Sequence, residues 1–480
     1  MNRPLRILVA AVTLLLVGLT ILRMFESWPN DSHLDHVSGA WVALASDLHS
    51  GLFYRAPYGA DGYGGTRFFP LFFCLHAAGL ALSGGWRFSG YVLSAASVVF
   101  LLAGCYCLLR KSGVDRWLAV AGCAAVLAGS SVQDAFLTIR EDGLAAALNV
   151  WGVALCAGEY SRRRLYISAV LFALAFATKE TSVFGAAGLI LALLASKKVG
   201  DGVRLGIATA IGYAAVIVTM YAASGGRAFE GLRLTLATGS GFYSLLNSPI
   251  TLAEAMNGYR EEMILLALAL TAFALTRARL RLPGLWFLCT LAVTLVIFSS
   301  EGTAGNHLID LLVASVAVFT VWISDLSSPD LGMSLLASAS LVAWLGLMVQ
   351  HRYDDLVPVH SQLQEIVRAA GNSGRPILSD NPLVPLEAGQ RPYVLDAFMF
   401  RVLQERVPNF GDPMWQMLKQ RRFGAVVLVD NPDSEEGKDT YSNYHFGDAF
   451  MEVLRQNYEP AGSAGTEYIF VPRKNPAEVH

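Results

Sequence analysis

Residues 7–55 read ILVAAVTLLLVGLTILRMFESWPNDSHLDHVSGAWVALASDLHSGLFYR. The stretch opens with an apolar run of the length that crosses a bilayer, which takes about 20 residues. Charged residues follow directly, and from Val37 to Leu48 the pattern predicts an amphipathic helix lying along a membrane surface. A membrane span that leads into a polar loop with its own surface helix predicts a membrane-embedded fold.

The composition of the whole chain supports this interpretation. Of 480 residues, 54% are hydrophobic and 15% are charged, whereas a soluble chain carries about 25% charged residues. Residues 1–350 contain 43 Asp, Glu, Lys and Arg, and the much shorter segment 351–480 contains 31. We therefore expect a polytopic α-helical membrane domain over 1–350 and a small C-terminal α/β soluble domain over 351–480. An all-soluble enzyme, a disordered chain and a fibrous protein are excluded.

Two further classes of function lose support from the composition. The net charge of −2 provides no basic field for binding a nucleic acid. All six cysteines lie in apolar segments, so neither a disulfide framework nor a cysteine-based metal site is predicted.

Eleven apolar segments qualify as membrane spans by length and hydrophobicity. They are 5–24, 89–109, 117–134, 142–157, 165–178, 182–196, 205–223, 263–276, 284–300, 306–323 and 331–350. Segment 69–83 is a twelfth possibility, but it has only fifteen residues and includes a proline and a histidine.

The charges of the loops decide the orientation. If the N-terminus is cytoplasmic and 69–83 does not cross, the cytoplasmic segments contain 14 Lys and Arg in 42 residues and the opposite loops contain 8 in 121. This is the positive-inside bias. A crossing at 69–83 would invert every later loop and expose the run 162–164, Arg-Arg-Arg, so we expect 69–83 to be a re-entrant or interfacial helix. Loop 25–88 and the tail then lie outside.

The tail alternates helices and strands in its pattern of apolar residues. Helices are expected at 361–371, 412–422 and 446–458, and strands at 375–380, 423–430 and 466–473. Docking onto the membrane domain is its simplest role.

The first outer loop contains Asp31, Asp35 and Asp47 together with three histidines, His33, His36 and His49. Ionisable residues at a membrane boundary are costly and are candidates for function. Asp35 precedes the surface helix, where it could equally be an N-cap. A metal site formed by His33, Asp35 and His36 is a weaker alternative.

Two short outer loops contain further charges. Arg140, Glu141 and Asp142 begin one predicted span, where they could also form a solvated turn with its acids near the helix dipole. Lys179 and Glu180 lie between two short spans, where a lysine suits a lipid phosphate. Alternatively, Lys179 could extend toward water beside Glu180.

The last outer cluster is less specific. The segment 299–312, SSEGTAGNHLIDLL, includes Glu301, Asn306, His307 and Asp310, and Arg260 with two glutamates precedes the eighth span. A carboxylate on this face could take a proton from an attacking hydroxyl or amine, and cations could stabilise a departing lipid phosphate.

Four motifs occur in a characteristic order: ALASDLHSG-LFYR after Asp35, TRFFPLFF (66–73), IREDGLAAAL (139–148) and FATKETS (176–182). This order resembles the GT-C glycosyltransferases of the family 39 type, which include protein O-mannosyltransferases, aminoarabinose transferases and Rgt-like bacterial transferases. The resemblance covers roughly residues 1–200. Beyond it, only the hydropathy and the GNHLIDLL segment agree.

The resemblance implies an inverting transferase of the bacterial inner membrane that uses a polyprenyl-phosphate sugar, without a metal or another cofactor. It implies that Asp35 is the general base, that Asp142 with Glu141 positions the acceptor or supports the site, and that Lys179 and Arg67 hold the donor phosphate. The remaining candidates for substrate binding are Asp31, Arg140, Arg260 and His307.

Several alternatives stay open at this point. His36 follows Asp35 where the family often has an acidic or small residue, Pro70 stands without a second proline, and Asp31 is near enough to compete as the base. The acceptor could be a glycan, a lipid or a protein. A membrane transporter or lipid flippase would also use charges in a membrane protein, although no inverted repeat is visible. A non-catalytic scaffold is the third possibility.

Overall fold

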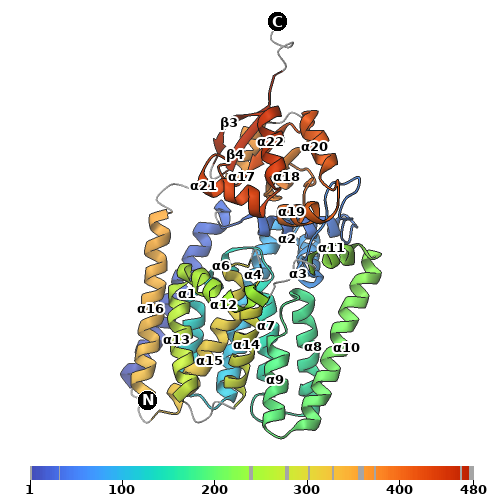
Figure 1. Cartoon of the computed structure of the whole chain (residues 1–480). Coiled ribbons are helices and arrows are strands. Elements are labelled where there is room, and N and C mark those ends of the chain that lie inside the picture. Colours follow the sequence, from blue (N-terminus) through green and yellow to red (C-terminus); the bar gives the residue numbers. More distant parts are fainter. Residues whose placement is uncertain are drawn as a thin grey trace.

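The computed structural model describes residues 3–31, 33–236, 242–275, 281–300, 303–326, 329–354, 362–371, 374–464 and 467–474. Figure 1 shows a bundle of roughly parallel and antiparallel helices covered at one end by the C-terminal cap (residues 362–474). The N-terminus lies at the opposite end of the bundle from the cap.

A helix, or in one case a bent pair of helices, occupies each of the eleven predicted spans. These are α1 (Arg3–Ser27), α4 (Trp86–Lys111), α5 (Arg116–Leu127) with α6 (Ser130–Leu137), α7 (Asp142–Cys156), α8 (Arg162–Thr178), α9 (Phe184–Ala195), α10 (Val199–Ser224), α13 (Arg260–Leu275), α14 (Leu282–Ile297), α15 (Ile309–Ser324) and α16 (Pro329–Asp354).

Length and composition qualify only some of these helices as full spans. Within the described ranges, four helices are long and apolar enough to cross a membrane, and a fifth crossing results if the pair α5 and α6, bent by 68°, is one span. The chain is thus an integral membrane protein, while the count of eleven crossings stays a prediction. Ala128 and Gly129 separate α5 from α6, and a Cβ at Gly129 would lie 2.3 Å from Leu312 Cδ2, so a larger residue there would require Leu312 to shift.

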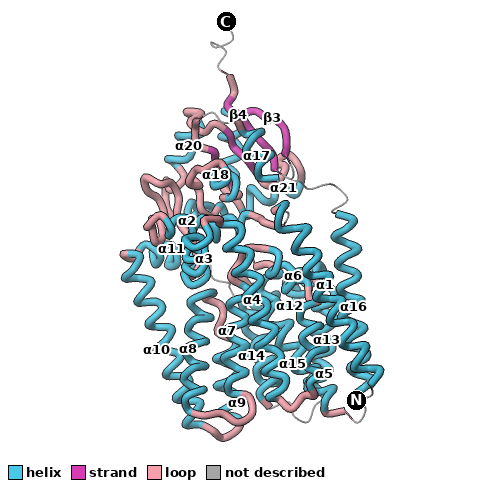
Figure 2. Tube along the Cα trace, turned by 180° about the vertical axis from the view of Figure 1, so that it is seen from behind, coloured by secondary structure: helices cyan, strands magenta, loops and turns pink. Residues whose placement is uncertain are grey.

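Two short helices form a layer between the bundle and the C-terminal cap. They are α2 (His36–His49) and α3 (Pro70–Ser83), which pack against each other at the cap end of the bundle (Figures 1 and 2). α3 is the segment expected to be re-entrant or interfacial, and its fourteen residues are short for a crossing. Two further helices, α11 (Arg227–Leu236) and α12 (Phe242–Ala255), follow α10.

The C-terminal cap contains a four-stranded sheet in the order β1-β2-β4-β3. β1 and β2 are parallel, with Leu378 opposite Val426, and β4 runs antiparallel to both of its neighbours. Its elements are α17 (Gln362–Ala370), β1 (Ile377–Ser379), α18 (Leu383–Glu387), α19 (Ala397–Arg406), α20 (Asp412–Lys419), β2 (Ala425–Leu428), α21 (Glu435–Asp439), α22 (Asp448–Asn457), β3 (Tyr458–Ala464) and β4 (Glu467–Pro472). The predicted helices and strands occur, while α18, α19, α21 and β3 were not predicted.

One continuous apolar core joins the cap to the membrane part. It contains Trp41 of α2, Phe72 of α3 and Leu383 of α18, all fully buried. The backbone of the outer loop also joins the cap, because Tyr63 N–H donates to Tyr393 O (2.7 Å) and Leu395 N–H donates to Tyr63 O (2.9 Å). The cap is therefore fixed on the outer loop.

Candidate active site

Asp35 lies at the N-terminus of α2, where both of its predicted roles are compatible. Its Oδ1 accepts a hydrogen bond from Ser38 N–H (2.9 Å), so it is the N-cap of the helix. Its Oδ2 forms an ion pair with the guanidinium of Arg140. The Asp35 side chain remains 39% exposed, which leaves the carboxylate open to an incoming group.

The surroundings of Asp35 keep it ionised. Burial by itself raises the pKa of this carboxyl, but Arg140, then His36 and the Ser38 N–H, outweigh burial and hold the pKa below its usual value. At neutral pH the group is therefore a carboxylate, the form in which it can accept a proton.

Asp142 and Lys179 meet across two neighbouring helices. Asp142 is the first residue of α7 and Lys179 directly follows the last residue of α8, so the packing of these antiparallel helices brings both ends to one level. Lys179 Nζ lies 2.5 Å from Asp142 Oδ1, and Asn306 Nδ2 donates to the same oxygen at 3.0 Å. Both charged residues are buried, so Lys179 does not extend toward water, and its partner is Asp142 rather than Glu180.

His307 links this pair to the other cations. It lies in a short 3-10 turn, Gly305–Leu308, within electrostatic reach of Lys179, Arg67 and Arg140. The guanidinium of Arg67 stacks on the ring of Phe398 in the cap, 4.7 Å from its centroid. Three cations from three separate segments thus act electrostatically on one imidazole.

Glu141 is buried between Arg140 and Asp142. Burial, and next the negative charge of Asp142, raise the pKa of the Glu141 carboxyl. Glu141 therefore holds a proton more readily than an ordinary glutamate and can donate a hydrogen bond inside the site.

Asp31 belongs to a different cluster. Its Oδ2 pairs with Arg87 Nε at 2.8 Å, and Arg87 also pairs with Glu387 of α18 at 2.8 Å. Tyr91 O–H donates to Asp31 Oδ1 (3.4 Å). Asp31 thus connects the outer loop to α4 and to the cap, and its carboxylate is occupied by these contacts.

Arg260 also lies apart from Asp35 and Lys179. It is exposed at the start of α13, on the rim of a cavity of about 660 Å³ between α5, α13 and α16. The walls are mainly apolar, and the neighbouring Glu261 accepts from the Ser130 N–H at 2.9 Å. Glu301 of the sequence-based cluster lies outside the described residues.

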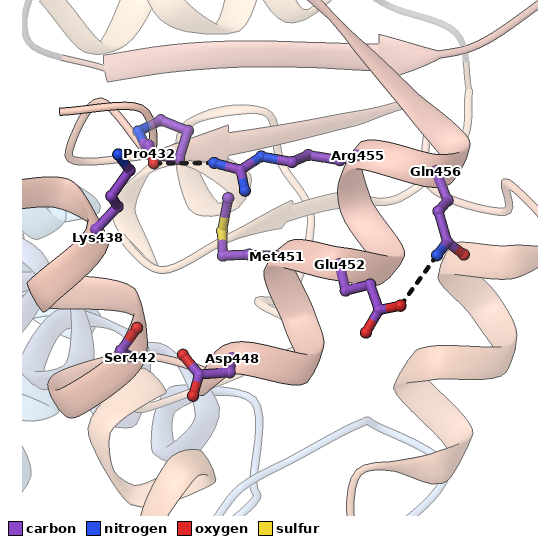
Figure 3. A pocket seen from close by; sticks show the side chains of 8 residues that line it. All are labelled: Pro432, Lys438, Ser442, Asp448, Met451, Glu452, Arg455 and Gln456. Carbon is purple, nitrogen blue, oxygen red and sulfur yellow. Dashed lines mark hydrogen bonds between the residues drawn. The ribbon is translucent and has the colours of Figure 1, made fainter.

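A second cavity lies wholly on the C-terminal cap. It has a volume of about 430 Å³ and is lined by polar residues of α21, α22 and their connection, including Lys438, Asp448 and Glu452 (Figure 3). Arg455 beside it donates to Pro432 O at 3.2 Å. This cavity includes none of the residues predicted to form the site.

Sequence analysis missed several buried polar contacts around the site. Tyr259 O–H donates to Asp134 Oδ2 (3.2 Å), and Asp134 in turn is within electrostatic reach of Arg140. Asn149 Nδ2 donates to Asp310 Oδ1 at 3.5 Å. Asp134 could have been predicted as a candidate site residue, because it is a lone carboxylate at the end of an apolar segment.

No protein-family model and no curated relative matches the sequence. Solved structures match it over nearly the whole chain. ArnT from Cupriavidus metallidurans bound to undecaprenyl phosphate matches with a TM-score of 0.62 at 13% identity, over 95% of this chain and 97% of that chain. The Archaeoglobus fulgidus oligosaccharyltransferase in its apo form matches with a TM-score of 0.58 at 10% identity, over 98% of this chain and 74% of that chain.

A third match is AglB, the oligosaccharyltransferase of Archaeoglobus fulgidus, in complex with an inhibitory peptide and a dolichol-phosphate. Its TM-score is 0.55 at 11% identity, again over 98% of this chain and 74% of that chain. ArnT and AglB are members of the GT-C superfamily. The chain therefore has the fold of the GT-C membrane glycosyltransferases, and the expectation from the four motifs is confirmed at the level of the fold.

Proposed function

We propose that the chain is an inverting glycosyltransferase that moves a sugar from a polyprenyl-phosphate donor to an acceptor on the outer face of a bacterial inner membrane. The observation that carries the proposal is the convergence of Asp35, Arg140, Asp142, Lys179 and His307 beneath the cap, from separate segments of a GT-C fold. In Figure 1, α7 and α8 lie side by side in the bundle and α2 lies above them, directly below the cap.

Asp35 is the general base in this mechanism. It takes the proton from the acceptor hydroxyl or amine as that group attacks the anomeric carbon, and the bond from this carbon to the phosphate oxygen breaks. Attack from the face opposite the phosphate inverts the configuration. The 39% exposure of its side chain supports this role, because a base must reach the acceptor proton.

Lys179 and Arg67 bind the phosphate in this proposal, and His307, within electrostatic reach of both, adds a hydrogen-bonding group. The charge that develops on the leaving phosphate is stabilised by fixed cations, which act more strongly in a water-poor site. Asp142 keeps Lys179 charged and in place before the donor arrives, since a buried lysine without a partner loses its proton readily. Arg140 fixes the orientation of Asp35.

Neighbouring structures support the donor class, because one contains undecaprenyl phosphate and another a dolichol-phosphate. The loop charges support a cytoplasmic N-terminus, and the opposite placement of the cap supports its location outside. The sugar and the acceptor stay unassigned.

The experiment is transfer of a radiolabelled sugar from a polyprenyl-phosphate donor, measured in membranes that contain the wild-type protein or the Asp35→Asn variant. We expect a labelled product with wild type and almost none with the variant. Movement of the donor lipid across the bilayer without a labelled product would instead identify a flippase, and the transferase proposal would be abandoned.

A further inference from the structure

The C-terminal cap reaches the N-terminus of α2, the helix that begins beside Asp35. A Cβ added to Gly39 of α2 would lie 2.9 Å from Pro382 Cδ and 3.0 Å from both Asn381 Oδ1 and Leu383 N. The segment that follows β1 is therefore in direct contact with the first turn of α2. The residues of this segment therefore contact α2 within about one helical turn of Asp35, the candidate base.

The segment carries Asp380, which is fully buried at the end of β1. One of its carboxylate oxygens accepts from Val429 N–H at 3.1 Å. The other lies 3.1 Å from Nδ1 of His445 and accepts from Tyr441 O–H at 3.0 Å. A carboxylate oxygen accepts hydrogen bonds, so Nδ1 of His445 is the donor in this contact.

His445 connects this network to the site. Its ring contacts the ring of His36 edge-to-face, with centroids 4.7 Å apart. His36 directly follows Asp35 at the start of α2. A chain of contacts thus runs from Asp380 through His445 and His36 to Asp35, and it crosses from the cap to the outer loop.

We propose that the cap completes the active site: His445, held by Asp380, is a positioning residue that packs against His36 and fixes it beside Asp35. This inference rests on the proposed function, in which Asp35 is the base. It assigns a catalytic purpose to the cap, which the sequence motifs do not assign.

The benefit for catalysis is electrostatic. Asp35 already has one cation, Arg140, and a protonated His36 would add a second and make the carboxylate less basic. The charged and titratable groups around His36 are His445, Asp35, Asp380 and Arg140. Burial, and next His445, lower the pKa of His36, while the two aspartates raise it less strongly.

The neighbours of His445 fix its role further. Within the cap, Asp380 contacts His445, and Tyr441 donates to Asp380. From α2, the ring of His36 contacts the ring of His445. Glu467 and Asp430 lie near Asp380, but Glu467 accepts from Asn381 Nδ2 (2.9 Å), and the carboxylate at 3.1 Å from the imidazole is Asp380.

The test compares His445→Asn with the wild-type full-length protein in membranes. Asparagine can still donate to Asp380, but it places no ring against His36. Residues that orient metal-bound imidazoles are typically worth about 10–100-fold in metal affinity or activity. By analogy we expect kcat to fall by about tenfold with the KM for the donor unchanged. The acid limb of the pH profile should move to higher pH, because His36 loses the neighbour that disfavours its proton.

His36→Gln should move the acid limb of the pH profile to lower pH, because no second cation can then form beside Asp35 in addition to Arg140. The matched control is His49→Gln, which changes an exposed histidine at the other end of the same helix and should leave the profile unchanged. If His445→Asn and His36→Gln both behave like His49→Gln, or if only the KM for the donor changes, the proposal is wrong.

A second readout does not need sugar transfer. Since the folded protein disfavours a proton on His36, the unfolded chain takes up this proton below about pH 6.5 and the folded chain does not. The Tm of the wild type should therefore fall as the pH drops below about 6.5, and His36→Gln should remove part of that fall. A pH-dependent Tm that His36→Gln leaves unchanged contradicts the histidine pair, whereas absent sugar transfer with the expected Tm contradicts only the proposed reaction.

Discussion

The two carboxylate oxygens of Asp35 have different roles. Oδ1 caps α2, and Oδ2 pairs with Arg140 in the candidate site. Replacement by asparagine separates the two functions, because Asn caps helices about as well as Asp but is not a base. We expect Asp35→Asn to retain expression with only a small loss of Tm, because Arg140 loses one ion-pair partner, and to lose about 10²–10⁴ in kcat, the usual value of a positioned general base. Transfer assays together with thermal unfolding measure both. Full activity of this variant would remove Asp35 from the mechanism.

Asp31→Asn provides the comparison within the same loop. Asp31 is 3% exposed and paired with Arg87, which is itself 33% exposed and keeps Glu387 as a partner. We expect the variant to lower the stability by about 1–3 kcal/mol, the cost of weakening a buried polar contact, while kcat remains near wild type. If instead kcat collapses and Tm is unchanged, Asp31 is the base.

Lys179 requires a variant that does not leave a buried charge behind. Lys179→Met alone would strand Asp142, whereas Lys179→Met with Asp142→Asn leaves a neutral pair of similar size. We expect the double variant to fold and to show a KM for the donor raised by at least tenfold, or no turnover. Lys179→Arg should keep part of the activity, because it keeps the charge but changes the geometry. Wild-type donor kinetics in the double variant would make Lys179 a purely structural residue.

The sequence was sufficient to predict which membrane face these residues share, but not which of them form ion pairs. Loop position in a helical membrane protein places Asp35, Asp142 and Lys179 on one face, and this follows from the sequence alone. That Lys179 pairs with Asp142 rather than with its neighbour Glu180 depends on where α7 begins and α8 ends. Helix ends are uncertain by one or two residues even in a structure, which is enough to change the partner.

Among the elements, α2 transmits the position of the cap to the site. Gly39 allows the close contact with Pro382, and a side chain there would push the cap away from the helix. We expect Gly39→Leu to make the cap more sensitive to limited proteolysis and to reduce kcat, while the protein still inserts into the membrane. Gly18→Leu is the matched control, because a Cβ at Gly18 of α1 meets no atom within 4 Å. Equal protease resistance of the two variants would contradict this role of α2.

The periodicity of apolar residues was sufficient for the bundle helices and for β1, β2 and β4. It was insufficient for α18 and α19, which are short and lie in a segment rich in prolines and polar residues. The sequence did not identify His445 as a candidate site residue, because its role depends on contacts with Asp380, 65 positions earlier, and with His36, from another part of the chain. Contacts between distant segments carry no local pattern.

For the whole molecule, the direction of insertion remains the decisive prediction. A reporter that is active only outside the cytoplasm, fused after His480, should be active, and one fused before Met1 should be silent. The physical reason is the concentration of Lys and Arg in the loops on the N-terminal side. A silent C-terminal fusion would indicate a cytoplasmic C-terminus and an even number of crossings, with α3 as the first element to reconsider.

The contact between the outer loop and the cap also has a consequence for biosynthesis. Arg55 Nη1 donates to Pro392 O (2.7 Å), and these residues are 337 positions apart. At about 5–20 residues per second, the ribosome needs roughly 17–70 s to synthesise the chain between them. In the proposed topology, the loop after α1 is exported during that interval but lacks the cap surface against which it packs. This topology therefore implies that the loop with Asp35 stays incompletely folded outside the membrane until the cap has been translocated.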